Sequence, residues 1–462
     1  MAGMRLSTVA DLLGGKLIGE DAEFHSVSAD TRTLKKGDIF IALKGENFDG
    51  HEYIKAAADA GALGAMVSHF VETTIPLLVV ADTRLSLGHL AGLWRARFPG
   101  PLVAITGSNG KTTVKEMIAS ILRQSGPVLA TTGNLNNDIG VPLTLLRLRD
   151  EHEAAVIEMG ASAGGEINYL AAIAEPSVAI ITNAAPAHLK GFGSIEDVAR
   201  AKGEIFEGLS EDGVAVINAD DKFAPLWKEL TGDRRSITFG LKNRADVTAD
   251  TDTILCRVEA GNFITTFSMR TPQGNTEIKL KLAGKHNVLN ALAATAAALA
   301  AKATLNNVKL GLEELRPVAG RLQLKQGVNQ ACIIDDSYNA NPASLNAAIE
   351  VLADLVGYKI LVLGDMAELG ADELPMHHQI GVFARACKID ALFGLGPLSQ
   401  HAVAAFGAAA QHFTNHDELS SALSQYIAGL QTPVTVLIKG SRSSRMERIV
   451  EALTNTASGK KT

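Results

Sequence analysis

Runs of consecutive apolar residues, each about as long as a β-strand, recur along most of this chain and are separated by longer segments of helical periodicity. One set lies at residues 102–105, 154–157, 178–181 and 214–217, and a second at 333–334, 360–363, 391–393 and 434–438. Such runs are typical of parallel strands, because both faces of a parallel sheet are buried. The pattern therefore predicts two doubly wound α/β regions.

Two further segments show a different pattern. The first 85 residues hold short strand-like runs, such as residues 38–43, and a helix near residues 51–61 that ends at a glycine. Residues 236–283 alternate between apolar and polar positions, most clearly at 263–267 and 278–282, which predicts antiparallel strands. We expect a helix over residues 288–302 after them.

Length and turn-forming residues suggest how the chain is divided. At about 150 residues per domain, 462 residues correspond to about three domains. The sequence Pro99-Gly100-Pro101 is typical of a hinge, and Arg316-Pro317 precedes the second α/β region. We predict a small α/β domain at 1–85, a central parallel-sheet domain at 86–316 and a C-terminal Rossmann-like domain at 317–462.

Composition and charge argue against several classes of protein. Hydrophobic residues make up 47% and charged residues 20%, which is typical of a chain that buries cores rather than of a disordered one. The net charge of −7 argues against broad binding to nucleic acid. The 3 cysteines lie far apart, so we expect neither a disulfide framework nor a structural zinc site.

The distribution of apolar residues also indicates in which compartment the protein is expected. The longest apolar stretch, residues 291–301, is too short to span a bilayer. Residues 1–18 contain no signal-peptide core. We therefore expect a cytoplasmic protein without membrane insertion.

The strongest chemical signal follows the apolar run at 102–105. It comprises Gly107, Ser108, Asn109, Gly110, Lys111, Thr112 and Thr113. Glycines let backbone N–H groups surround a phosphate, and the N-terminus of the following helix favours negative charge. Lys111 would neutralise nucleotide phosphates, and the Thr112 hydroxyl would reach Mg²⁺. Because Ile105 stands where the full phosphate-loop pattern has glycine, an ordinary glycine turn stays an alternative.

Two more candidate residues follow predicted strands, and a third lies in a predicted helix. Glu158 ends the run at 154–157 and is a candidate ligand for Mg²⁺, or else a glutamate on the surface rim. His188 follows the run at 178–181, where loop or core histidines are more common than ligands. Lys202 lies in a predicted helix, and from the residues alone it is a solvated lysine.

Taken together and in order, these motifs resemble the Mur ligases, ATP-dependent amide-forming enzymes of peptidoglycan precursor synthesis. The resemblance extends over essentially the whole chain. It rests on residues 106–112, 158–160, 183–188, 201–206, 284–290 and 320–321, and further on 132–142, 335–342 and 363–370. It implies a central P-loop ATPase domain.

The resemblance also implies roles for individual residues. Lys111 and Thr112 match positions for ATP phosphate and magnesium, Glu158 and His188 match ligands of a second magnesium, and Lys202 matches a lysine that carries a carbamate (N6-carboxylysine). Asn287 matches a residue near adenine, Asp336 a ribose contact, and Arg321 a phosphate contact from the third domain. The implied catalytic residues are Lys111, His188, Lys202 and Arg321. The loop that holds the uridine-diphosphate end is matched by Ser28, Asp30, Thr31 and Arg32.

The implied activity is amide formation through an acyl phosphate, using ATP and two Mg²⁺ ions. Residues 132–142, 335–342 and 363–370 favour UDP-N-acetylmuramoyl-tripeptide and D-alanyl-D-alanine as substrates. The third residue of the tripeptide, diaminopimelate or lysine, is left open. We expect a monomer that does not bind nucleic acid.

Two alternatives remain at this point. One is another ligase of the same type that adds a different amino acid, including a folylpolyglutamate-type enzyme. The other is a phosphate-loop switch or motor NTPase, which would hydrolyse ATP without an amine. The sequence lacks an N-K-x-D element for reading guanine, and a switch does not explain Gly320-Arg321 in a third domain.

Overall fold

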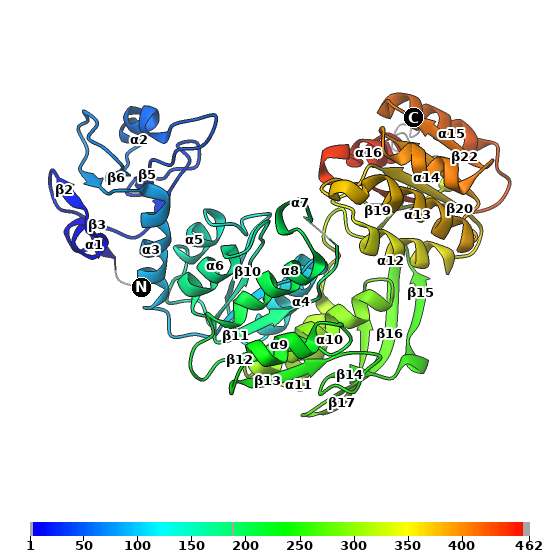
Figure 1. Ribbon diagram of the computed structural model, residues 1–462, viewed down its shortest axis with the longest axis horizontal. Helices are drawn as coiled ribbons and strands as arrows, with labels where there is room; N and C mark the ends of the chain where they lie inside the picture. The colour runs from blue at the N-terminus through cyan, green and yellow to red at the C-terminus, as the bar shows by residue number, and fades with distance from the viewer. Residues whose placement is uncertain (1–2, 187–188, 456–462) are drawn as a thin grey trace.

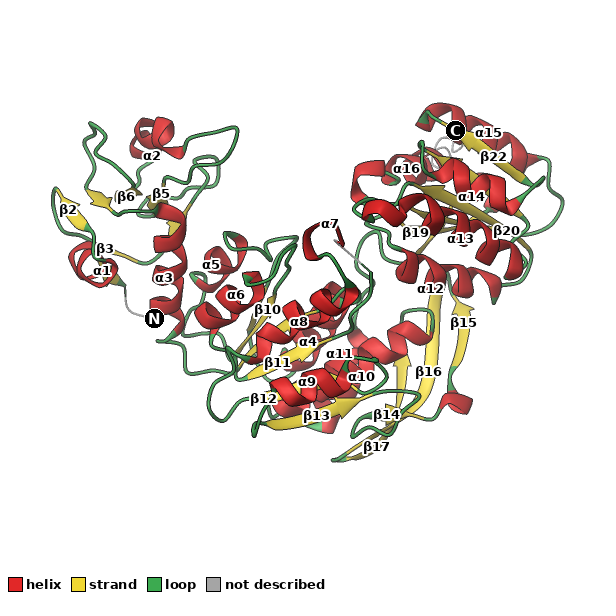
Figure 2. Cartoon of the chain, viewed as in Figure 1, coloured by secondary structure: helices red, strands yellow, loops and turns green. Residues whose placement is uncertain are grey.

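The computed structural model describes residues 3–186 and 189–455. The chain forms three successive parts, each built around its own main sheet. The first and third parts lie at opposite ends of the central part (Figure 1). Helices cover the sheets of all three parts (Figure 2), which confirms a mixed α/β fold.

The first part contains a five-stranded sheet with the order β2-β7-β6-β5-β4. Its strands are β2 (Lys16–Ile18), β4 (Val27–Ser28), β5 (Ile39–Ile41), β6 (Gly64–Val67) and β7 (Leu77–Val79). All pairs are parallel except β2 with β7. The remaining elements are β1 (Met4–Arg5), β3 (Glu23–Phe24), α1 (Leu6–Leu13), the 3-10 turn η1 (Gly50–Tyr53) and α2 (Ile54–Asp59).

The central part is built on a six-stranded, fully parallel sheet with the order β13-β12-β11-β8-β10-β9. Its strands are β8 (Leu102–Thr106), β9 (Val128–Ala130), β10 (Ala154–Glu158), β11 (Val178–Ile181), β12 (Val214–Asn218) and β13 (Arg235–Phe239). The helices are α3 (Thr83–Arg95), α4 (Lys111–Leu122), α5 (Gly140–Leu145), α6 (Glu166–Ala174), α7 (Leu189–Phe192), α8 (Ile195–Gly203), α9 (Ala224–Leu230), α10 (Lys285–Ala300) and α11 (Leu305–Glu314).

Alternate residues of the central strands serve two different cores. Leu102 and Ala104 of β8 pack with α3, α5 and α6, whereas Val103 and Ile105 pack with α4, α10 and α11. Since successive side chains of a strand point to opposite faces, an unbroken apolar run is what a sheet covered on both sides requires.

A four-stranded antiparallel sheet extends from the central part. It consists of β14 (Thr248–Ala249), β15 (Leu255–Glu259), β16 (Asn262–Thr271) and β17 (Gly274–Leu280). The prediction that antiparallel pairing begins at residue 236 is wrong, because β13 pairs in parallel with β12 at the edge of the main sheet. Its alternating sequence reflects an edge strand, in which Arg235 is exposed, Phe239 is buried and the positions between them are partly buried.

The third part is a six-stranded sheet with the order β18-β19-β23-β20-β21-β22. Only β18 is antiparallel to its neighbour. The strands are β18 (Gln323–Gln326), β19 (Cys332–Asp336), β20 (Tyr358–Gly364), β21 (Ala391–Leu395), β22 (Ala410–Phe413) and β23 (Val434–Lys439). The helices are α12 (Pro342–Ala353), α13 (Glu373–Ala386), α14 (Ser399–Phe406), α15 (His416–Ala428) and α16 (Glu447–Asn455).

The helix α3 joins the first two parts. Its buried residues, among them Leu87, Leu90 and Trp94, belong to a core that runs without a break from the first part into the central one. The predicted boundary after residue 85 therefore falls within this helix, and the exact domain limits stay a prediction. Among the described residues, none of the helices has the length and apolar character needed to cross a membrane.

Candidate active site

A cavity of ≈ 1230 Å³ opens where the carboxyl end of the central sheet faces the third part. Ligands of open parallel sheets bind at this edge, beyond the carboxyl ends of the strands. The lining includes residues of the glycine loop at 107–113, Glu158 and Lys202 from the central part, and Arg321 and Asp336 from the third part. Most of the predicted site residues are thus brought together in one place.

The glycine loop joins β8 to α4 at the wall of this cavity. Gly107 and Gly110 have φ values of 149° and 81°, a region that side chains rarely adopt. A Cβ at Gly107 would also lie 1.8 Å from the Thr182 hydroxyl oxygen. The helix α4 begins directly after Gly110, and no side chain caps it. Its first N–H groups are therefore suited to bind an anion.

The loop is fixed in place by the segment that follows β11. The Asn109 N–H donates to Asn183 Oδ1 (3.0 Å), and the Asn183 side-chain amide donates to the Asn109 carbonyl (3.1 Å). The Thr182 hydroxyl donates to the same carbonyl (2.6 Å). These contacts hold a rigid loop of the kind that phosphate binding needs.

Lys111 lies folded against its own loop. Its Nζ donates to the Gly107 carbonyl (2.6 Å) and to the Ser108 carbonyl (3.4 Å). Burial lowers the pKa of Lys111, the Glu158 carboxylate opposes this shift, and the Arg321 guanidinium adds to it. The ammonium group is therefore poorly solvated, which suits the binding of an anion.

Glu158, at the end of β10, is 3% exposed. Its Oε1 accepts a hydrogen bond from Asn136 Nδ2 (3.0 Å), whereas its Oε2 is buried and has no hydrogen-bond partner among the described residues. A buried carboxylate oxygen without a partner is costly. A cation bound there would remove that cost, so Glu158 fits the expected magnesium site.

Lys202, in α8, is buried rather than solvated, with an exposure of 4%. Burial lowers its pKa to about 7, and the positive charge of Lys111 contributes to the shift. The Nζ lies 5.9 Å from the centre of the Phe192 ring. The expectation of a solvated helix lysine, drawn from the residues alone, is therefore wrong. His188 lies outside the described residues.

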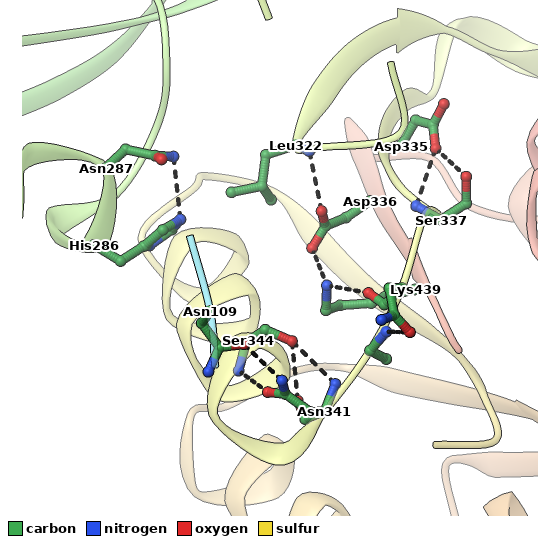
Figure 3. Close-up of polar contacts among 12 residues, drawn as sticks. Asn109, His286, Asn287, Leu322, Asp335, Asp336, Ser337, Asn341, Ser344 and Lys439 are labelled. Atoms are coloured by element: carbon green, nitrogen blue, oxygen red, sulfur yellow. Dashed lines mark hydrogen bonds and ion pairs between the residues drawn. The ribbon is translucent and has the colours of Figure 1, made fainter. Parts of the chain in front are cut away.

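The third part reaches the glycine loop through two side chains. Arg321 Nη2 donates to the Thr112 hydroxyl (3.1 Å), and the guanidinium carbon lies 4.6 Å from the centre of the Tyr338 ring. Asn341 Nδ2 donates to Asn109 Oδ1 (2.6 Å), a contact drawn in Figure 3. Arg321 Nε is buried without a hydrogen-bond partner among the described residues, so it too is available for an anion.

Asp336 forms a buried ion pair with Lys439 (Figure 3). Lys439 Nζ donates to Asp336 Oδ2 (2.6 Å) and to the Asn339 carbonyl (2.8 Å), and Asp336 Oδ1 accepts from the Leu322 N–H (3.2 Å). Since both carboxylate oxygens already have partners, a ribose hydroxyl would have to share them.

Asn287 lies at the start of α10 in a small polar network (Figure 3). Its Nδ2 donates to the Ala283 carbonyl (2.8 Å) and contacts His286 Nε2 (3.1 Å), while its Oδ1 accepts from Asn290 Nδ2 (3.0 Å). Burial lowers the pKa of His286 to about 4, and the charge of Lys439 contributes. The imidazole is therefore neutral and accepts the hydrogen bond from Asn287.

The predicted nucleotide-sugar loop does not join this cavity. Ser28, Asp30, Thr31 and Arg32 lie in the first part and are not among the residues lining it. The Asp30 carboxylate pairs with the Arg32 guanidinium (2.7 Å), and this pairing lowers the pKa of Asp30 to about 2. Ser28 is buried and its hydroxyl donates to the Asp30 carbonyl (2.9 Å), so the loop forms a closed turn.

Four asparagines at the site had no role from sequence reasoning. They are Asn136, Asn183, Asn290 and Asn341, and each makes the side-chain contacts described above. All four lie within motifs that resemble the family, but an isolated asparagine gives no sign of its partner. Only the proximity of distant segments assigns them.

Comparisons with known proteins agree with this architecture. Residues 23–86 match the model described as Mur ligase family, catalytic domain, residues 105–298 the Mur ligase middle domain, and residues 320–442 the Mur ligase, glutamate ligase domain. The three matched segments fall in the three parts of the structure, in the same order.

Individual relatives are similar along their whole length. The chain is 44% identical to the UDP-N-acetylmuramoyl-tripeptide–D-alanyl-D-alanine ligase of Escherichia coli, covering 98% of this chain and 99% of that one. A crystal structure of MurF from Acinetobacter baumannii has a TM-score of 0.91 at 36% identity, covering 98% and 100%. MurF ligase from Thermotoga maritima, in complex with ADP, has a TM-score of 0.83 at 28% identity, covering 95% and 99%. On this evidence the chain belongs to the Mur ligase family.

Proposed function

We propose that this protein is an ATP-dependent ligase that joins D-alanyl-D-alanine to UDP-N-acetylmuramoyl-tripeptide and forms the UDP-muramoyl-pentapeptide of peptidoglycan synthesis. One observation carries the proposal. A glycine loop that opens an uncapped helix, a buried carboxylate oxygen without a partner among the described residues and an arginine from the third part meet in one cavity. Relatives similar over the full length carry this activity in their name.

The reaction needs activation of a carboxylate, which is a poor electrophile. A carboxylate oxygen of the tripeptide attacks the γ-phosphorus of ATP and ADP leaves, giving an acyl phosphate. The amine of the dipeptide then attacks the acyl carbon, and the tetrahedral intermediate expels inorganic phosphate. The first step brings several negative charges together, so catalysis here is chiefly positioning and charge stabilisation.

The nucleotide would occupy the cavity with its phosphates at residues 107–113. Both Lys111 and Arg321 hold partners that a phosphate can replace, namely the Gly107 carbonyl and the Thr112 hydroxyl. Asn287 and Asp336 lie at the same cavity and are proposed to contact adenine and ribose. A phosphate would thus release Thr112 to bind a metal.

Two Mg²⁺ ions are proposed to act at this site, one beside Thr112 and one beside Glu158, His188 and Lys202. When bound, they would offset phosphate charge as Lewis acids. The described residues contain no group of three His, Cys, Asp or Glu side chains able to hold a metal by themselves. Mg²⁺ commonly takes one or two carboxylates and completes its shell with substrate phosphates and water, so the Glu158 carboxylate could serve as its protein ligand.

Lys202 is proposed to carry a carbamate. With a pKa of about 7, its amine is partly neutral at physiological pH and can react with CO₂. The product is an anion with two hard oxygen ligands, which suits a magnesium site better than an ammonium group does.

The first part is proposed to hold the uridine-diphosphate end through Ser28, Asp30, Thr31 and Arg32. We also propose that the protein is divided at 1–85, 86–316 and 317–462 and acts as a monomer. The proposed partners do not include nucleic acid.

The decisive test is ADP release measured with the UDP-muramoyl-tripeptide and a panel of amines. Release that requires both the tripeptide and D-alanyl-D-alanine supports the proposal. Release with another amino acid in place of the dipeptide would assign a different ligase of the family. ATP turnover that needs neither substrate would instead indicate a switch or motor NTPase.

A further inference from the structure

The last residues of β19 and β23 place a carboxylate and an ammonium group side by side at the cavity. The two strands are parallel neighbours, and Asp336 pairs in register with Lys439. The helix after β19, α12, packs on one face of the sheet, whereas the helix after β23, α16, packs on the other. Open parallel sheets bind ligands where neighbouring strands lead to opposite faces. Both residues line the cavity at this point.

Lys439 is almost entirely buried and is held by two acceptors. Its side chain is 4% exposed, and that of Asp336 is 11% exposed. Its Nζ donates to Asp336 Oδ2 (2.6 Å) and to the Asn339 carbonyl (2.8 Å). A lysine held in this way presents a charge at a fixed position, unlike the flexible ammonium of a surface lysine.

The ionised form of Asp336 depends on this lysine. Burial raises the pKa of the Asp336 carboxyl, whereas the charge of Lys439 and its hydrogen bond lower it, and the charge of Arg321 contributes. Arg321 donates to the Thr112 hydroxyl and stacks on Tyr338. Of the two cations, Lys439 is therefore the one in direct contact with the carboxylate. Without it, burial would favour the neutral carboxyl.

The ionised carboxylate keeps free acceptor sites that face a ligand. A carboxylate offers about four such sites. Asp336 uses one on Oδ2 for Lys439 and one on Oδ1 for the Leu322 N–H (3.2 Å), so each oxygen retains one. Two free sites on neighbouring oxygens fit a pair of adjacent hydroxyl groups.

We infer that Lys439 is a positioning residue, which keeps Asp336 ionised and fixed in orientation so that its two oxygens accept hydrogen bonds from the 2′ and 3′ hydroxyls of the nucleotide. The inference rests on the proposed function, in which Asp336 contacts the ribose. In this role Lys439 touches no substrate and acts on the nucleotide only through Asp336.

The test compares ATP with 2′,3′-dideoxy-ATP, which lacks both hydroxyls, by kcat/KM for phosphate release in the complete ligation reaction. Wild type is expected to prefer ATP by about tenfold or more, because the dideoxy nucleotide leaves a charged acceptor unpaired. Lys439→Met removes the charge at similar length. It should lower this ratio about tenfold, mainly by raising KM for ATP.

A matched control breaks the same kind of ion pair outside the cavity. Lys325 Nζ donates to the carboxylate of Asp335 (2.7 Å), the residue directly before Asp336, and neither Lys325 nor Asp335 lines the cavity. Lys325→Met should therefore keep the wild-type ratio. In an Asp336→Asn background, Lys439→Met should lower the ratio no further, since the lysine acts through the carboxylate.

Removing one partner of a buried ion pair is destabilising, so thermal unfolding is measured for each variant. If Lys439→Met does not fold, Lys439→Gln replaces it, because its amide can donate to Asp336 without a charge, and the same lowered ratio is expected. A wild-type ratio in the variant that folds, or an equal loss with both nucleotides from ordering of the loop at Asn339, overturns the inference alone. Equal use of both nucleotides by wild type overturns the ribose contact as well. A protein that turns over neither nucleotide with the tripeptide and the dipeptide overturns the proposed function.

Discussion

Lys111 and Lys202 are both buried, but their amines have different surroundings. Burial lowers the pKa of both. Lys111 keeps two carbonyl acceptors and lies near Glu158, so its charged form retains partners. Lys202 has its pKa lowered to about 7, with a second lysine adding to the shift. The same residue type therefore suits two roles, a phosphate-binding cation and a nucleophilic amine.

We predict that Lys111→Ala loses nearly all ligation activity while the fold survives. The loss of a cation at the transferring phosphate should reduce kcat by about a hundredfold to a thousandfold. ADP release and thermal unfolding measure the two properties. Lys55→Ala, at an exposed position of α2 with an ion pair to Asp59, is the matched control. Normal turnover of a folded Lys111→Ala protein would contradict the assignment of residues 107–113 as a phosphate-binding loop.

We predict that Lys202→Ala and Lys202→Arg both lose ligation by about a hundredfold or more, while ATP binding is retained. Arginine keeps the positive charge but cannot form this carbamate. Formate at high concentration should partly restore turnover of Lys202→Ala, because it places a carboxylate where the carbamate would be. Near wild-type ligation by Lys202→Arg is the outcome that contradicts the carbamate.

A pH dependence follows from the lowered pKa of Lys202. Above about pH 7 the amine is largely neutral and reacts with CO₂, and below it the amine is protonated and does not. Incorporation of labelled CO₂ into the metal-free protein should therefore fall as the pH is lowered through 7. Mass spectrometry after trapping of the carbamate measures it, and Lys202→Arg gives the background. Labelling that stays constant across this range would contradict the assignment.

At the scale of elements, the loop between β9 and α5 holds the carboxylate of β10 in place. Asn136 donates to Glu158 Oε1 (3.0 Å), and its carbonyl accepts from the Gly160 N–H (2.8 Å). The Thr131 hydroxyl at the start of the loop accepts from the Glu158 N–H (2.9 Å). Lys115, 2% exposed, donates to the Thr131 carbonyl (2.7 Å) and so ties this loop to α4. The helix α4 and the strand β10 are therefore coupled through one loop.

We predict that Asn136→Ala raises the Mg²⁺ concentration needed for half-maximal ADP release by about tenfold to a hundredfold, because Glu158 loses the group that orients it. A magnesium titration measures the effect. Asn134→Ala, at an exposed position of the same loop, should leave the magnesium requirement unchanged. An unaltered requirement in Asn136→Ala would show that Glu158 needs no support from this loop.

At the scale of the whole molecule, the regions proposed to bind the substrates do not all meet at one cavity. The third part already touches the glycine loop through Arg321 and Asn341, while the Ser28–Arg32 turn lies in the first part, away from the cavity. The first and third parts lie at opposite ends of the central one (Figure 1). A nucleotide-sugar peptide that spans from the first part to the phosphate loop would draw them together, and closure would exclude water from the acyl phosphate.

We predict that ATP and the UDP-muramoyl-tripeptide together, without the dipeptide, reduce the radius of gyration. Small-angle scattering measures it with each ligand alone and with both. Arg321→Ala should show a smaller reduction, since it removes a contact between the third part and the phosphate loop. An identical radius of gyration with and without both ligands would contradict the closure of the domains.

The local sequence was sufficient to predict an element wherever one short segment contains everything that makes that element form. An apolar run of strand length must be buried on both faces, so the strands at β8, β10, β11, β12, β20 and β23 could be predicted. The glycine loop could be predicted for the same reason, because the φ values of Gly107 and Gly110 and the start of α4 are properties of consecutive residues. Strands β18 and β22 carry polar residues at sheet edges and gave no such pattern.

Only the tertiary structure decided which residues meet. Asn136 with Glu158, Arg321 with Thr112 and Asp336 with Lys439 are pairs separated by 22, 209 and 103 positions, and no local pattern encodes a contact at such a distance. The burial of Lys202 could not be predicted from the sequence either, because a helical lysine is exposed or buried according to what packs over it. The sequence by itself thus determined the buried strands and the glycine loop that opens α4. The packing of three parts determined the cavity, its charges and the amine with a lowered pKa, since these depend on the burial and electrostatics of groups far apart in the chain.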